Sequence, residues 1–131
     1  MVIDTSALVA VLLQERDADR VAQAIDAGSP RLLSAASLLE ASIVIASRKG
    51  EAGGRELDLL MYRAGIEVVA VDQNQAETAR ATWRRFGKGR HPAGLNYGDC
   101  FAYALARSSR LPLLFRGNDF SQTDIDCLPV L

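Results

Sequence analysis

The sequence predicts an α/β domain in which helices cover both faces of a central parallel sheet. Strand-like and helix-like segments alternate along the whole chain, which is the pattern of parallel sheets joined by helical crossovers. Of the 131 residues, 49% are hydrophobic and 24% are charged, which is a globular composition. No repeat or Pro/Ser-rich linker divides the chain, so we expect one domain over residues 1–131 with α/β/α layers.

The first half of the chain is predicted to supply two strands and four helices. In order these are strand 2–3, helix 5–14, helix 17–27, strand 31–34, helix 37–48 and helix 55–64. Thr5 or Ser6 is the predicted cap of the first helix. Gly28, in a left-handed conformation, is expected to end the second helix, and Gly50 the third. Gly53-Gly54 is expected to separate the third and fourth helices.

The second half continues the alternation. In order we predict strand 66–71, helix 73–86, loop 87–95, helix 97–109, strand 112–116 and a last edge strand at 127–131. Asp72 and Asn96 are the predicted caps of the two helices. Gly117-Asn118 forms a turn, and an edge position tolerates Pro129.

Composition excludes several classes of protein. The formal net charge is −1, so any nucleic-acid partner must be held by a local basic patch rather than by a global field. No apolar run approaches the ~20 residues of a membrane span, and no signal-peptide pattern begins the chain. Cys100 and Cys127 form neither a disulfide framework nor a zinc cluster. We expect a cytoplasmic protein with reduced thiols and no membrane partner.

Four carboxylates are predicted to meet at one edge of the sheet. Asp4 follows the first strand, and Asp119 follows strand 112–116. Glu40 and Asp99 are expected in the first turns of two helices, whose N-termini lie at the same carboxyl edge as the strand ends. Each acid alone has an ordinary alternative role as a cap, capping-box or turn residue. Gathered together they would repel strongly without a cation, and oxygen ligands suit Mg²⁺ or Mn²⁺.

These residues suggest a hydrolytic chemistry. Metal held by Asp4 and Asp99 would activate water and polarise a phosphate, while Glu40 and Asp119 would complete the cage or orient the water. The Ser6 hydroxyl is a candidate phosphate or carboxylate contact, with a helix cap as its alternative role.

Three motifs, in order along the chain, resemble those of PIN-domain ribonucleases. They are VIDTSAL at 2–8, NYGDCFAYALA at 96–106 and LFRGNDF at 114–120, with Glu40 between the first and second. In size the chain is most similar to the VapC toxins of VapBC toxin–antitoxin pairs. The resemblance implies a PIN-like fold and a metal-dependent endoribonuclease site at Asp4, Glu40, Asp99 and Asp119, acting on tRNA or other structured RNA. It also implies a homodimer and a cognate VapB-type antitoxin. Asp124 is a possible extra or substitute ligand.

A basic stretch precedes the helix that carries Asp99. Arg84, Arg85, Lys88 and Arg90 are candidate RNA-phosphate contacts, and the alternative is a solvated helix face with a flexible loop. Two rival functions remain open. A phosphatase with an aspartyl nucleophile would need a second Asp at position 6, where Ser6 stands. A degenerate PIN-like module that binds RNA or protein without cleaving would be expected to lack one or more of the acids.

Overall fold

The computed structural model describes residues 1–128 and contains a five-stranded parallel sheet of order β3-β2-β1-β4-β5. The strands are β1 (Val2–Ile3), β2 (Leu32–Ser34), β3 (Glu67–Val69), β4 (Leu113–Leu114) and β5 (Cys127–Leu128). The helices are α1 (Thr5–Leu12), α2 (Ala18–Ala27), α3 (Ala35–Ala64), α4 (Gln73–Phe86), α5 (Tyr97–Ser109) and a 3-10 turn, Phe120–Gln122. The α/β prediction is confirmed. Because β1 is the central strand, the residue that follows it lies in the middle of the carboxyl edge.

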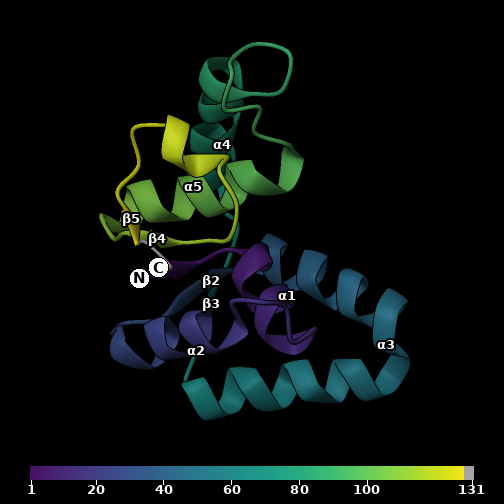
Figure 1. Cartoon of the computed structure of the whole chain (residues 1–131). Helices are drawn as coiled ribbons and strands as arrows, with labels where there is room; N and C mark the ends of the chain where they lie inside the picture. Colours follow the sequence, from purple (N-terminus) through teal and green to yellow (C-terminus); the bar gives the residue numbers. More distant parts are fainter. Residues whose placement is uncertain (129–131) are drawn as a thin grey trace.

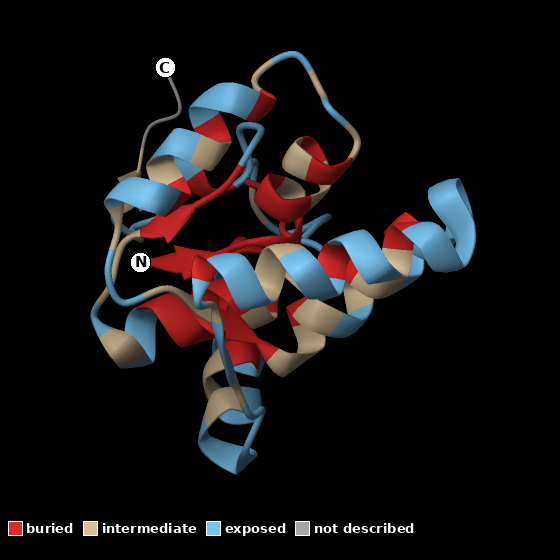
Figure 2. Ribbon diagram, turned by 90° about the horizontal axis from the view of Figure 1, so that it is seen from below, coloured by how far each residue is buried: buried red, intermediate tan, exposed pale blue. Residues whose placement is uncertain are grey.

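Helices cover both faces of this sheet (Figure 1). α1, α2 and α3 lie on one side, and α4 and α5 lie on the other. The side chains of successive strand residues point alternately to the two faces of the pleated sheet and so into the two helical layers. Ile3 and Leu114 belong to the core under α1–α3, whereas Val2 and Leu113 belong to the core under α4–α5. All four are fully buried, and Figure 2 shows the buried strands between helices whose outer faces are exposed.

Two predicted helix ends differ from those in the structure. The cap of α1 is Asp4 rather than Thr5 or Ser6, because the Asp4 carboxylate accepts a hydrogen bond from the Ser6 amide. The end of α2 does fall at Gly28, but this residue has φ −95° and is not left-handed. Sequence alone cannot distinguish a residue that begins a helix from the residue that caps it.

The long element α3 also differs from the prediction. It starts at Ala35, capped by Ser34, so Glu40 lies in the second helical turn and not in the first. The chain breaks at Gly50, which has φ +63° and is where the third helix was predicted to end. Gly53 and Gly54, which were predicted to separate the third and fourth helices, are instead helical. Gly53 lies inside the second half of α3, where a Cβ would come within 2.7 Å of Ile45. Gly53 therefore allows the two halves of α3, before and after Gly50, to pack closely.

The strands at the sheet edges are short. β3 covers only part of the predicted strand 66–71 and is largely exposed. β5 confirms an edge strand at 127–128, and the predicted continuation over 129–131 lies outside the described residues. Within residues 1–128, none of the helices is long and apolar enough to cross a membrane.

Candidate active site

Asp4 is positioned by the junction of β1 and α1. It is 4% exposed, and its Oδ2 accepts hydrogen bonds from the Ser6 amide at 3.0 Å and the Ser6 hydroxyl at 2.6 Å. The Ser6 oxygen in turn accepts a hydrogen bond from the Arg116 amide, just beyond β4, at 3.0 Å. The Ser6 hydroxyl therefore links the Asp4 carboxylate, at the end of β1, to the backbone just beyond the neighbouring strand β4.

Asp99 is held by the first turn of α5. Its Oδ2 accepts a hydrogen bond from the Asn96 amide at 3.0 Å, and its own amide donates to Asn96 Oδ1 at 2.9 Å. This reciprocal capping box was the structural alternative for Asp99, and it is present. It does not exclude a chemical role, because one carboxylate oxygen makes the cap and the side chain still lines a cavity that the other three predicted carboxylates share.

All four predicted carboxylates line one cavity of about 330 Å³ at the carboxyl edge of the sheet. We call it the acidic cavity. Asp4 comes from the end of β1, Glu40 from α3, Asp99 from α5 and Asp119 from the segment after β4. Asp4 is buried, Glu40 and Asp99 are half-buried, and Asp119 is exposed. The convergence predicted from strand and helix ends is therefore observed, although Glu40 arrives from a second turn.

Burial and repulsion from neighbouring carboxylates raise the pKa of two of these side chains. Burial raises the pKa of Asp4 to about 6, with a contribution from the charge of Glu40, while the hydrogen bonds from Ser6 oppose the shift. Burial likewise raises the pKa of Asp99 to about 7. The charges of Asp4, Asp119 and Glu40 add to that rise. The acidic cavity thus concentrates negative charge that a cation would neutralise.

The donor chemistry of the acidic cavity fits a hard divalent cation. Carboxylate oxygens are the ligands that Mg²⁺ and Mn²⁺ prefer, and the lining residues include neither His nor Cys. Within residues 1–128, no three His, Cys, Asp or Glu side chains are close enough to form a ready-made metal cluster. Ligation would therefore require the carboxylates to draw together. Asp119, which is exposed, is the side chain best able to move.

Sequence reasoning missed Arg116 as a lining residue. Among the described residues that line the acidic cavity, it is the one basic side chain. Its guanidinium pairs with Glu15 and Asp17, both at 2.7 Å. The Arg116 charge is therefore neutralised from the α1–α2 side of the cavity. Its place two residues after β4 and three residues before Asp119 was the signal that could have identified it.

The predicted basic residues lie outside the acidic cavity. Arg84 and Lys88 are exposed near the end of α4, and Arg90 stacks on the Trp83 ring at 4.9 Å. Arg85 instead pairs with Asp124 at 2.9 Å. Asp124 also pairs with Arg107 and accepts a hydrogen bond from the Tyr103 hydroxyl. Asp124 is not among the residues that line the acidic cavity.

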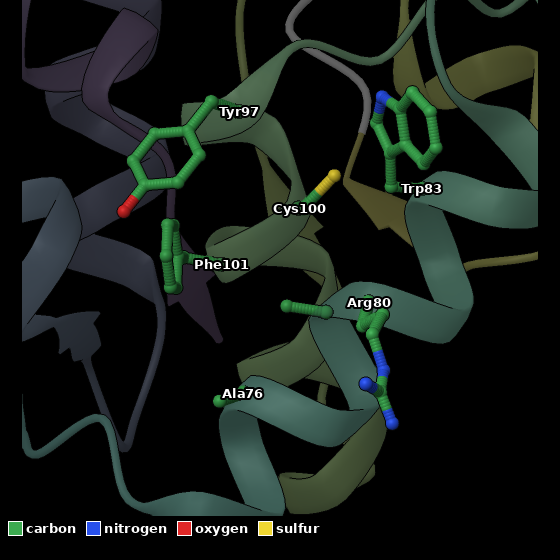
Figure 3. A pocket seen from close by; sticks show the side chains of 7 residues that line it. Ala76, Arg80, Trp83, Tyr97, Cys100 and Phe101 are labelled. Atoms are coloured by element: carbon green, nitrogen blue, oxygen red, sulfur yellow. The ribbon is translucent and has the colours of Figure 1, made fainter.

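A second, apolar pocket of about 450 Å³ lies between α4 and α5. Figure 3 shows Tyr97 and Phe101 on one wall, Trp83 and Arg80 on the other, and Cys100 between them. Tyr97 is 80% exposed and Trp83 41% exposed, so neither is a core residue. This α4–α5 pocket shares the first turn of α5 with the acidic cavity.

Comparisons with known proteins agree on one family. The family model described as PIN domain matches residues 1–126. Ribonuclease VapC30 of Mycobacterium tuberculosis is 60% identical over 125 residues, which are 95% of this chain and 95% of that protein. The crystal structure of Mycobacterium tuberculosis VapC20, a sarcin-ricin loop cleaving toxin, has a TM-score of 0.80 at 15% identity and 97% coverage of both chains. VapBC2 from Rickettsia felis, bound to a DNA fragment from its promoter, has a TM-score of 0.73 at 15% identity, covering 98% and 96%.

The two solved structures establish the fold alone, because their sequence identity is low. The family rests on the PIN match over nearly the whole chain and on the 60% identical relative. The chain belongs to the PIN-domain family and, within it, to the VapC ribonucleases.

Proposed function

We propose that the protein is a divalent-metal-dependent endoribonuclease toxin that hydrolyses RNA at the acidic cavity. The observation that carries the proposal is the convergence of Asp4, Glu40, Asp99 and Asp119 from four separate segments into one cavity. The activity named for the 60% identical VapC30 supports it. The sarcin-ricin loop is the named target of VapC20, which supports a structured RNA, such as tRNA or ribosomal RNA, as the substrate class.

Asp4 and Asp99 are the residues proposed to hold Mg²⁺ or Mn²⁺, with Glu40 and Asp119 completing the donor set or orienting water. When bound, such an ion lowers the pKa of a water molecule and polarises the scissile phosphate. Ser6 keeps the Asp4 carboxylate turned into the cavity, and the Asn96 amide does the same for Asp99. Both carboxylates are thus pre-oriented at a fixed backbone edge, which reduces the reorganisation needed for ligation.

Exposed basic side chains are proposed to hold the RNA backbone outside the cavity. Arg84 and Lys88 are the best candidates among the predicted contacts, because Arg85 is engaged with Asp124 and Arg90 with Trp83. Phosphate contacts of this kind would give affinity with little sequence preference. They would also explain how a chain with net charge −1 binds a polyanion.

A VapB-type antitoxin is proposed to block the acidic cavity. The fold shared with the toxin–antitoxin complex VapBC2 supports such a partner. An arginine from the antitoxin would suit the cavity, because its planar guanidinium can bridge two carboxylates. A homodimer is proposed as well, with the α4–α5 pocket as its candidate surface, since exposed Trp83 and Tyr97 are side chains typical of interfaces.

The decisive test is cleavage of RNA by the purified protein with controlled metal. Cleavage should stop in EDTA and return with Mg²⁺ or Mn²⁺, and sequencing of RNA ends after induced expression should show discrete cut sites. Undiminished cleavage after rigorous chelation would overturn the metal-dependent mechanism. Binding of RNA without any cleavage in Mg²⁺ or Mn²⁺ would instead support the alternative of a degenerate binding module.

A further inference from the structure

Gly98, in the first turn of α5, lies directly against the carboxylate of Glu40. A Cβ placed on Gly98 would be 2.2 Å from Glu40 Oε2, 2.7 Å from Cδ and 2.8 Å from Oε1. All three of these nearest atoms belong to the end of one side chain. Because a Cβ does not approach an oxygen or carbon atom that closely, any side chain at position 98 would displace the Glu40 carboxylate from this place.

The backbone does not explain why glycine stands here. Gly98 is not among the glycines with positive φ, and it occupies a helical position where alanine is the better helix former. What requires glycine is therefore space and not conformation. The space is taken by Glu40 from α3, which lines the acidic cavity together with Asp4 and Asp99.

The same close approach places Glu40 at the positive end of α5. The first amides of a helix have no intrahelical acceptors, so a negative charge beside them is stabilised. This attraction offsets part of the repulsion that Glu40 experiences from the other carboxylates in the cavity. A Cβ at position 98 would occupy this space and move the Glu40 carboxylate away from the favourable field.

We propose that Gly98 is a positioning residue of the active site, whose missing side chain lets Glu40 reach its working position. The inference rests on the proposed function in one respect, namely that Glu40 takes part in metal-dependent cleavage. Gly98 itself touches neither metal nor RNA in this proposal. Its effect is exerted through Glu40 alone, and that makes it testable by a double-mutant cycle.

Gly98→Ala is expected to leave the fold intact, because the clash is with the end of a flexible side chain that can swing away. Its melting temperature should equal or exceed that of the parent. RNA cleavage should fall at least tenfold in kcat with little change in KM, because a displacement of about 1 Å at a reacting group can cost a hundredfold. Calorimetric titration with Mn²⁺ alone should show weaker binding.

The matched control is Gly54→Ala. Gly54 is also a helical glycine, in α3, but a Cβ there meets no atom within 4 Å. Its cleavage rate and Mn²⁺ affinity should not change. The cycle is completed by Glu40→Ala and by Glu40→Ala combined with Gly98→Ala, which should behave alike in both assays because the group that Gly98 accommodates is already gone.

The outcomes separate this inference from the proposed function. If Glu40→Ala is impaired and Gly98→Ala cleaves and binds Mn²⁺ normally, the role of Gly98 is refuted while the proposed function stands. The same role is refuted if Gly98→Ala is equally harmful in the Glu40→Ala background, or if it lowers the melting temperature by more than about 5 °C, which indicates lost helix packing. Full activity of Glu40→Ala would refute the assignment of Glu40 itself.

Discussion

Replacing Asp4 with asparagine should stabilise the metal-free protein while abolishing its chemistry. Both hydrogen bonds from Ser6 reach the same atom, Oδ2. An asparagine can keep its single carbonyl oxygen at that point and turn its amide group into the acidic cavity. The cap of α1 is then preserved, and the substitution removes only the charge.

The magnitude follows from the pKa of Asp4, which rises from 3.8 to about 6. An acid with a raised pKa in the folded state stabilises the fold below its unfolded pKa, and this stability is lost as the pH rises through the folded value. The shift of about 2 units corresponds to about 3 kcal/mol of unfolding free energy lost by pH 7. Asp4→Asn avoids this loss, so its advantage over the parent should grow from near zero at pH 4 to about 3 kcal/mol at pH 8.

Thermal melts in EDTA from pH 4 to 8 measure this difference. An advantage of about 3 kcal/mol would raise the melting temperature by roughly 10 °C for a chain of this length. RNA cleavage in Mg²⁺ should fall at least a hundredfold, because a metal contributes several kcal/mol to the transition state. Asp72→Asn is the matched control, since Asp72 caps α4 on the exposed surface and Asn is an equally good cap. A lower melting temperature of Asp4→Asn at every pH, with normal cleavage, would show that Asp4 is only a cap.

Three further predictions test other parts of the proposal. Asp99→Asn should fold, because an amide oxygen can replace the carboxylate in the capping box, and should cleave RNA at least a hundredfold more slowly in a single-turnover assay. Arg84→Ala combined with Lys88→Ala should weaken RNA binding and reduce the slope of log Kd against log salt by about 1.5; an unchanged slope would remove these residues from the RNA surface. Trp83→Glu should convert a dimer to a monomer in light scattering, whereas Tyr62→Glu on the exposed end of α3 should not.

The alternation of strands and helices and the place of the acids could be predicted because each depends on local signals. Asp4 follows a short apolar strand, and Asp99 follows Asn96 at capping-box spacing, so chain direction alone brings them to one edge. The break at Gly50 was predicted, but the start of the second half of α3 was not. Gly53 and Gly54 were predicted to separate two helices, yet both are helical and only Gly50 of the three takes a positive φ.

The ion-pair partners of charged side chains could not be predicted from the sequence either. Asp124 was a possible extra or substitute ligand from the sequence, but Arg85 of α4 and Arg107 of α5 pair with it outside the acidic cavity. Arg85 is consequently a poor candidate for RNA binding. Such pairings depend on how α4 and α5 pack against the end of the chain, and no local pattern encodes that packing.

The hydroxyl of Ser6 has a consequence for spectroscopy. Its one proton is donated to Asp4, and its oxygen accepts from the Arg116 amide. Any change in the charge on Asp4 alters the polarisation of that hydroxyl and therefore the strength of the bond from the amide. The NMR chemical shift of the Arg116 amide proton should therefore change when Asp4 is protonated or when a cation neutralises its charge. This signal reports the charge of Asp4 without a label in the cavity.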